Sequence, residues 1–281
     1  MLDVGHSYSE ARQALRALCP QPLLNWREAR FYGQYGEVEL HLLEFLCRHD
    51  ADAIDVGAND GSYVHYMRRS ARHVVAFEPM PMLAAALRQK FTRGVTVQEM
   101  ALSDHKGSIE LRMPVVDGVL VTGCATVSDD ASATYPAYQG VDVPMERLDD
   151  IYSGNCGFIK IDVEGHQQAV LDGAVETIMR CQPRMLVELE ERLSPGGLGR
   201  ARAFFEPLGY RAVFVWQGQL KPIDRFSVRT MQDQTNLPSL TAALTERQRF
   251  GRYVYNFIFL PPHEPESTIE KMTERLRSLA S

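Results

Sequence analysis

From residue 51 onward, short apolar runs alternate with segments of helical character. The expected strands are 51–56, 73–77 and 95–100, and the expected helices between them are 62–70 and 81–91. A strand that returns to its sheet through a helix runs parallel to the strand before it, so this order predicts βαβ units. We therefore expect an α/β protein in which helices flank a mostly parallel sheet.

The alternation breaks in the middle of the chain and then resumes. Two further strands, 108–113 and 141–145, flank the polar stretch 114–140, whose length is typical of a functional or disordered loop. Later elements are expected as strands 158–162, 185–189, 211–216 and 253–260 and as helices 167–180 and 198–207. The expected organisation is an N-terminal helical extension (1–50), a main domain (51–262) with a β-hairpin and loop insert at about 107–146, and a C-terminal tail helix (263–281).

The composition argues against several classes of protein. A net charge of −6 over 281 residues disfavours a nucleic-acid partner held by a basic surface. No apolar run is long enough to span a membrane, and residues 1–10 lack the charged and apolar regions of a signal peptide. The five cysteines form no CxxC pair, so we expect reduced thiols rather than a disulfide or zinc framework. These features predict a cytoplasmic protein.

The first expected strand ends in a glycine turn, Asp55-Val56-Gly57-Ala58-Asn59-Asp60-Gly61. Such a turn is typical of a nucleotide-type ligand at the carboxyl edge of the sheet. The turn has no GxGxxG motif, and its carboxylates would repel a pyrophosphate, which counts against a NAD-dependent dehydrogenase. The same charges favour a positively charged ligand without phosphate, such as S-adenosylmethionine. Glu78, at the end of the second strand, is placed to accept hydrogen bonds from ribose hydroxyls.

A second group of acidic residues follows the expected strand 158–162. Asp162 ends this strand, Glu164 and His166 come directly after it, and Glu188 lies at the end of the next expected strand. Asp162 and Glu164 share a face when the backbone is extended. Because sites in α/β proteins lie at the carboxyl ends of the strands, we expect these side chains to converge on one edge of the sheet.

Five segments, taken in order, resemble the FkbM family of methyltransferases. They are DVGANDG (55–61), AFEP (76–79), ALSD (101–104), FIKIDVEG (158–165) and LVE (186–188), and GQYGE (33–37) is similar to a segment found just upstream in that family. The resemblance implies a class I Rossmann-like fold with a seven-stranded sheet and S-adenosylmethionine as the methyl donor. It also implies transfer of the methyl group to a hydroxyl of a sugar or natural-product acceptor.

The resemblance further implies roles for individual residues. Glu78 would bind the ribose, and Asp162 would lie near the methyl group. The full set of implied cofactor-binding residues is Asp55, Gly57, Asn59, Gly61, Glu78, Ala101, Leu102 and Asp162. Methyl transfer to oxygen needs alignment and a base that takes the hydroxyl proton. Asp162, Glu188 and His166 are the three candidates for that catalytic base.

Several alternatives stay open at the level of the sequence. No metal site is predicted, although Asp162, Glu164 and Glu188 carry the hard oxygen ligands that suit Mg²⁺ or Ca²⁺. An N-methyltransferase is disfavoured because residues 162–165 do not form the Asn/Asp-Pro-Pro-aromatic motif common in enzymes that methylate amino groups of nucleic acids. A non-catalytic S-adenosylmethionine-binding module also fits. The expected partner is a small-molecule or glycan acceptor, and assembly into a homo-oligomer is left open.

Overall fold

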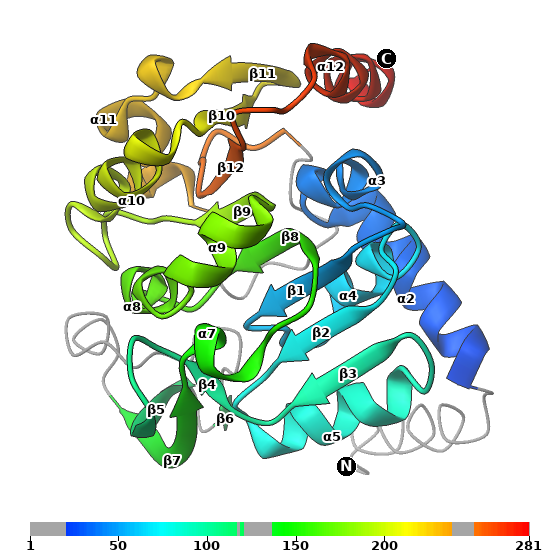
Figure 1. Cartoon of the computed structure of the whole chain (residues 1–281), viewed down its shortest axis with the longest axis vertical. Helices are drawn as coiled ribbons and strands as arrows, with labels where there is room; N and C mark the ends of the chain where they lie inside the picture. The colour runs from blue at the N-terminus through cyan, green and yellow to red at the C-terminus, as the bar shows by residue number, and fades with distance from the viewer. Residues whose placement is uncertain (1–20, 117–118, 121–136, 238–249, 281) are drawn as a thin grey trace, which may run out of the picture.

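The computed structural model describes residues 21–116, 119–120, 137–237 and 250–280. Eight strands form its main sheet: β1 (Asp52–Val56), β2 (Val74–Phe77), β3 (Val95–Gln98), β8 (Cys156–Ile161), β9 (Arg184–Glu188), β10 (Arg211–Trp216), β11 (Gln219–Pro222) and β12 (Asn256–Leu260). Their order is β11-β10-β12-β9-β8-β1-β2-β3 (Figure 1). The pairs from β3 to β9 are parallel, whereas β12 is antiparallel to both of its neighbours. The predicted Rossmann-like α/β class is confirmed.

The prediction of seven strands is wrong, because a hairpin adds β11 at the edge of the sheet. The chain turns back after β10 through Gln217 and Gly218, whose φ angles are +49° and +74°. Two successive residues with positive φ are typical of the tight type I′ hairpin turn, and Trp216 pairs with Gln219 across it. Gln-Gly is a weaker signal for this turn than Asn-Gly, so the sequence pattern did not reveal it.

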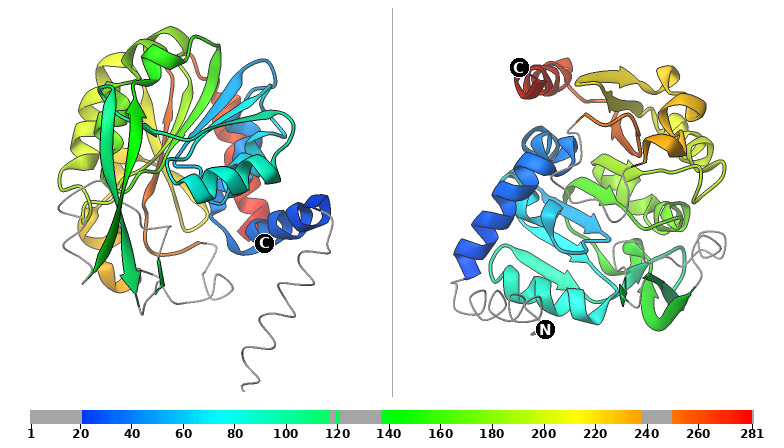
Figure 2. Two further views of the ribbon diagram at one scale, coloured as in Figure 1. Left: turned by 90° about the horizontal axis from the view of Figure 1, so that it is seen from below. Right: turned by 180° about the vertical axis from the view of Figure 1, so that it is seen from behind.

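Helices cover both faces of the main sheet (Figure 2). Alternate residues of a strand point to opposite faces, so Ile54 of β1 belongs to one apolar core and Ala53 to the other. The first core packs under α8 (Gln167–Asp172), α9 (Val175–Cys181) and α10 (Gly197–Phe205). The second packs under α3 (Leu43–Leu46), α4 (Ser62–Met67), α5 (Pro81–Lys90) and α12 (Glu266–Ala280).

The N-terminal extension is partly helical. The described part comprises α2 (Gln21–Tyr35), a 3-10 helix (Val38–His41) and α3, while the expected helix before residue 21 lies outside the described residues. Further short elements are α7 (Leu148–Ile151), α11 (Val228–Met231) and 3-10 helices at Glu206–Leu208, Ile223–Arg225 and Gln234–Asn236. Within the described part of the chain, no helix is both long and apolar enough to cross a membrane.

The single helix predicted over 167–180 is two helices, α8 and α9. A Cβ on Gly173, between them, would lie 1.9 Å from the carbonyl oxygen of Ser103, so this position makes a backbone contact that only glycine allows. The second helix then starts on a new axis, where the carboxylate of Asp149 accepts hydrogen bonds from the amides of Glu176 (3.0 Å) and Thr177 (2.8 Å). These donors are among the unpaired groups of a helix start, and a distant residue satisfies them.

A small second sheet lies beyond the carboxyl edge of the main one (Figure 1). It contains β4 (Ala101–Leu102), β5 (Gly107–Val116), β6 (Val119–Leu120) and β7 (Tyr138–Glu146) in the order β4-β7-β5-β6. The two long strands extend further than the predicted 108–113 and 141–145, because their pairing continues to Pro114 and Tyr138. Residues 121–136, the middle of the polar stretch 114–140, lie outside the described part of the chain.

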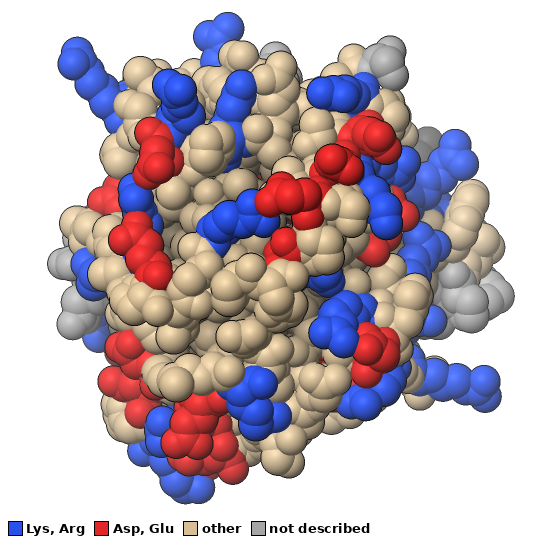
Figure 3. Space-filling view, turned by 45° about the horizontal axis from the view of Figure 1, so that its top comes forward, with Lys and Arg blue, Asp and Glu red and all other residues tan. Residues whose placement is uncertain are grey.

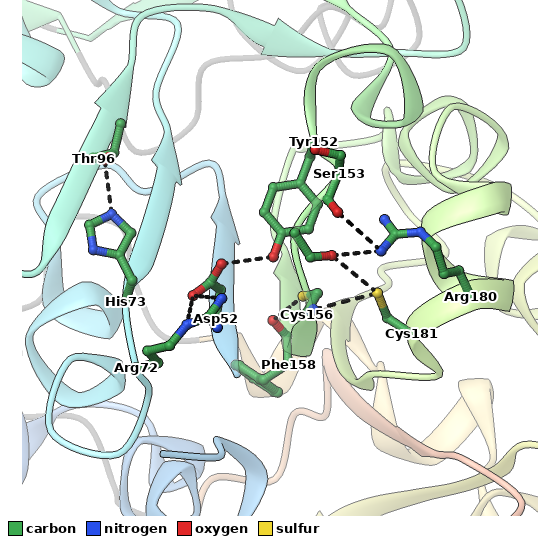
Figure 4. A network of polar contacts seen from close by, with 11 residues as sticks. Asp52, Arg72, His73, Thr96, Tyr152, Ser153, Cys156, Phe158, Arg180 and Cys181 are labelled. Carbon is green, nitrogen blue, oxygen red and sulfur yellow. Dashed lines mark hydrogen bonds and ion pairs between the residues drawn. The ribbon is translucent and has the colours of Figure 1, made fainter. Parts of the chain in front are cut away.

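The opposite edge of the main sheet, where β1 and β8 begin, is held by a polar network (Figure 4). Asp52 accepts hydrogen bonds from Arg72 Nε at 2.9 Å and from the hydroxyl of Tyr152 at 3.0 Å. The amide of Cys156 donates to Cys181 Sγ at 3.4 Å. These contacts tie the start of β8 to β1 and to the end of α9, so this edge serves packing and the carboxyl edge stays available for a ligand.

Candidate functional site

A cavity opens where β1, β2 and β8 end, beside the small sheet. Phe77, Met80 and Leu111 give it apolar walls. Six of the eight predicted cofactor-binding residues line it: Gly57, Asn59, Glu78, Ala101, Leu102 and Asp162. The expectation that these distant segments meet at one edge is therefore met.

The glycine turn is shaped by the neighbouring strand as well as by the cavity. The amides of Gly57 and Ala58 donate to the carbonyl oxygen of Phe77 at 3.0 and 3.1 Å, which fixes the turn to the end of β2. Gly57 has a φ of +81°, and a Cβ there would lie only 2.0 Å from the carbonyl oxygen of Asp162. Glycine is thus required for the close approach of the turn to the end of β8.

Gly61 and Asp60 lie outside the cavity wall. Gly61 has a φ of +79°, and a Cβ there would meet the ring of Phe91 at 2.5 Å, so this glycine serves the packing of α5. Asp60 accepts hydrogen bonds from the amide of Ser62 at 3.0 Å and from the hydroxyl of Tyr32. Its carboxylate therefore starts α4, whereas the sequence suggested that it faces a ligand. The predicted cofactor role of Gly61 stays a prediction.

Glu78 is the buried acid of the cavity. Its two carboxylate oxygens accept hydrogen bonds from the amides of Asn59 (2.7 Å) and Met80 (2.9 Å), so it joins the turn after β1 to the end of β2. Burial raises the pKa of Glu78 to about 7, although the two amides oppose this rise. Each oxygen keeps a lone pair that could accept a further hydrogen bond, which is what binding of ribose hydroxyls requires.

His166 lies on the side of the cavity formed by the end of β4. Its Nε2 is 3.0 Å from the hydroxyl oxygen of Ser103, the residue that follows the predicted cofactor-binding residues Ala101 and Leu102. Burial lowers the pKa of His166. This placement favours a positioning role for the histidine, and its predicted role as a catalytic base stays a prediction.

Three carboxylates gather where β8 and β9 end. Ligand oxygens of Asp162, Glu164 and Glu188 lie within 4.8 Å of one another, because β8 and β9 are neighbours with Ile161 paired to Val187. Burial, followed by repulsion from Asp162, raises the pKa of Glu188 well above its usual range. The same two causes raise the pKa of Glu164 to about 8. Both acids therefore take up a proton more readily than an exposed glutamate does.

Lys160 is a site residue whose importance the sequence interpretation missed. Its side chain is buried, with Nζ 2.9 Å from Asp162 Oδ2 and 3.7 Å from Asp55 Oδ1. Asp55 is fully buried and lies outside the cavity wall, and its carboxylate oxygens have no hydrogen-bond partner among the described residues. Burial raises the pKa of Asp55 to about 6, while the charge of Lys160 opposes the rise. A charged residue inside the apolar run FIKI was the available signal.

A second missed residue, Glu37, comes from the N-terminal extension. It accepts hydrogen bonds from the hydroxyl of Tyr63 and from Asn256 Nδ2 at 2.9 Å. Burial, followed by repulsion from Asp162, raises the pKa of Glu37. Asn256 is the register partner of Glu188, so β12 brings Glu37 to the carboxylate group. The segment 33–37 was matched to the family but was not assigned to the site.

The three carboxylates have the donor atoms for a hard divalent cation. Carboxylate oxygens are the ligands that Mg²⁺ and Ca²⁺ prefer, and Asp162, Glu164 and Glu188 are close enough to share one. Lys160 already occupies one oxygen of Asp162 and reduces the negative charge of the group. The prediction that no metal binds here stays a prediction.

Comparisons with known proteins identify the family of the chain. A family model described as the methyltransferase FkbM domain matches residues 55–212, which is more than half of the chain. A search of curated proteins finds no match.

Solved structures with some likeness have low sequence identity. A methyltransferase FkbM from Methylobacillus flagellatus KT is 14% identical, with a TM-score of 0.46, and the match covers 75% of this chain and 44% of that one. An rRNA methylase from Streptococcus thermophilus is 6% identical, with a TM-score of 0.44, and the match covers 79% and 93%. A Streptococcus mutans protein in complex with SAH is 9% identical, with a TM-score of 0.42 and coverage of 79% and 94%. The chain spans less than half of the length of the Methylobacillus protein. On the family match, this chain belongs to the FkbM methyltransferase family.

Proposed function

We propose that the protein is an S-adenosylmethionine-dependent O-methyltransferase that acts on a hydroxyl of a sugar or natural-product acceptor. The observation that supports this most is that Gly57, Asn59, Glu78, Ala101, Leu102 and Asp162 line one cavity. These residues come from four separate segments, and the order of segments is the one implied by the FkbM resemblance. Family membership adds methyl transfer as the reaction class.

The chemistry of the cavity suits this cofactor. Glu78 would hold the ribose, and the apolar side chains of Met80, Leu102 and Leu111 would contact the adenine. The carboxylates near the end of β8 favour a ligand that carries sulfonium and ammonium charges over one that carries a pyrophosphate. When bound, the cofactor supplies an electrophilic methyl group with a good leaving group. The residues of the chain then need to align the acceptor and remove one proton.

Asp162 is the best candidate for the base that takes the hydroxyl proton. It lines the cavity, and the ammonium of Lys160 lies 2.9 Å from its Oδ2, which orients the carboxylate. Glu188 and Glu164, with raised pKa values, are better suited to hold acceptor hydroxyls as donors or acceptors of hydrogen bonds. A positioned base contributes roughly 10²–10⁴-fold to such a reaction.

The acceptor is proposed to be a small molecule or glycan. Several carboxylates at one edge of a cavity suit a polyhydroxylated acceptor, because each oxygen can accept a hydrogen bond from a hydroxyl. The face shown in Figure 3 carries acidic and basic side chains interspersed, and the described residues on it form no continuous basic surface for a nucleic acid. A reducing compartment such as the cytoplasm suits the free thiols of Cys47, Cys156 and Cys181.

The test combines binding with turnover. Calorimetric titration with S-adenosylmethionine and with NAD shows which of the two cofactors the protein binds. Transfer of a labelled methyl group is then measured over panels of sugars, natural-product hydroxyls and amines. Each assay is run with and without EDTA to test whether transfer needs a metal ion. We expect binding of S-adenosylmethionine, transfer to a hydroxyl, and no loss with EDTA. Transfer only to amines, or binding of NAD alone, would refute the proposal. Binding without transfer to any panel member would favour a non-catalytic module.

A matched pair of variants ties binding to the cavity. Glu78→Gln removes the charge of the side chain and leaves one backbone amide facing an NH₂ group. We expect S-adenosylmethionine to bind at least about tenfold more weakly, because a hydrogen bond to a charged group is lost. Glu99→Gln removes a surface acid whose partner is Arg88, and it should bind as the wild type does. Equal affinities of the two variants would place the cofactor elsewhere.

A further inference from the structure

Lys160 is a cation in the interior of the molecule. It is the penultimate residue of β8, between apolar neighbours, and is 3% exposed. An ammonium group is costly to bury unless charges and hydrogen bonds compensate it. Asp162 Oδ2 lies 2.9 Å from its Nζ and Asp55 Oδ1 lies 3.7 Å away, and the ring centroid of Tyr63 is 4.6 Å from the same atom.

The backbone determines this arrangement. Asp55 and Lys160 are register partners on β1 and β8, so their side chains leave the sheet on the same face. Asp162 follows two residues later and points to that face as well. Tyr63, at the start of α4, packs its ring against the ammonium and donates its hydroxyl to Glu37. Contacts with Asp55, Asp162 and Tyr63 therefore fix the position of Nζ.

Lys160 can influence the cavity only through another residue. It is absent from the cavity wall, whereas Asp162 lines the cavity and its side chain is 29% exposed. One oxygen of Asp162 is bound to Nζ, which leaves the other for a ligand. Asp162 also lies within 4.8 Å of the oxygens of Glu164 and Glu188, so the ammonium of Lys160 offsets the negative charge of this acidic group.

We propose that Lys160 is a positioning residue that holds the Asp162 carboxylate toward the acceptor hydroxyl. The proposal rests on the function proposed above. Lys160 does not touch the substrate or transfer a proton itself. Its ammonium fixes the orientation of Asp162 through the contact with Oδ2.

The test is a double-mutant cycle on turnover, with Lys160→Met and Asp162→Asn. The probe is methyl-labelled S-adenosylmethionine with the panel acceptor that the wild type methylates fastest. Because misplacement of a reacting group by about 1 Å can cost 10²-fold, we expect Lys160→Met to lower kcat by about 10²-fold while KM for S-adenosylmethionine changes by less than about threefold. The double variant should be no slower than Asp162→Asn alone. If the two losses multiply, Lys160 acts independently of Asp162 and the proposal is wrong.

Two further variants keep the test interpretable. Lys160→Met leaves Asp55 unpaired in the interior and so threatens folding, whereas Lys160→Met combined with Asp55→Asn removes that charge as well. Lys90→Met is the matched control. Lys90 is also paired with an acid, Glu28 at 2.7 Å, and lies beside an aromatic ring, but it is absent from the cavity wall and is not paired with Asp162. It should lose stability and keep kcat.

A structural readout separates this proposal from the proposed function. Crystal structures of the ligand-free variants should show the Asp162 side chain displaced in Lys160→Met, with or without Asp55→Asn, and unchanged in Lys90→Met. If the wild type transfers no methyl group but Asp162 moves in this way, the proposed function fails and the positioning role stands. If Asp162 keeps its orientation without Lys160, the positioning role is refuted whatever the activity.

Discussion

Replacing Gly57 with alanine tests whether the contact between the glycine turn and β8 shapes the site. The added Cβ would lie 2.0 Å from the carbonyl oxygen of Asp162, inside any allowed contact distance. That oxygen belongs to a strand end that is held by the hydrogen bond from Asp162 N to Val56 O at 3.0 Å. Either the turn or the end of β8 must move, and Asp162 moves with it.

The loss of stability expected for Gly57→Ala has two parts. A residue with a side chain at a φ of +81° costs about 1–2 kcal/mol in the left-handed region. Crowding that forces a backbone shift adds about 1–3 kcal/mol. We expect Gly57→Ala to lower the free energy of unfolding by about 2–5 kcal/mol in total. Gly94 offers a matched control, because its φ is +72° and a Cβ there meets nothing within 4 Å, so Gly94→Ala should show only the first part.

The assays are urea unfolding followed by circular dichroism and calorimetric titration with S-adenosylmethionine. Gly57→Ala should be clearly less stable than Gly94→Ala and should bind the cofactor more weakly, while Gly94→Ala binds it as the wild type does. If both variants lose the same stability and both retain wild-type affinity, the contact between the turn and Asp162 has no part in shaping the site.

Two further predictions concern titratable groups. Glu39 is 7% exposed, and burial followed by repulsion from Glu37 raises its pKa to about 8. Between the ordinary pKa of a glutamate and about pH 8, Glu39 is protonated in the folded state and ionised in the unfolded state. The free energy of unfolding should therefore fall as the pH rises from about 5 to 8, and this group should contribute about 3 kcal/mol to the fall. Glu39→Gln should make this fall shallower in urea unfolding, unlike the exposed control Glu44→Gln, and an unchanged slope would contradict the assignment. His166→Ala removes the contact with Ser103. We expect this variant to bind the cofactor more weakly and to keep the pH profile of kcat. Loss of the acidic limb of that profile would instead identify His166 as the base.

The parallel half of the fold and the cavity wall were predictable because short stretches of sequence are enough to indicate them. Apolar runs bounded by helices locate β1, β2 and β8, and the residues that end such strands must meet at one edge. Glu78 and Asp162 were found in this way.

The remaining features depend on contacts between distant residues. Gly173 breaks a helix because it packs on Ser103, and Asp60 starts α4 instead of facing a ligand because Ser62 and Tyr32 donate to it. Lys160 pairs with Asp55 through the register of two strands about a hundred residues apart. No periodicity in the sequence encodes such pairings, so they had to be read from the structure.

The position of Glu37 has a consequence for how the protein is divided in the laboratory. The family match covers 55–212, and a fragment cut to that range would keep the glycine turn and Asp162. It would lose Glu37 together with Asn256, which donates a hydrogen bond to it and lies opposite Glu188 on β12. Such a fragment would expose the inner side of the acidic group to water, so the smallest unit that retains the complete site begins upstream of residue 37 and extends through β12.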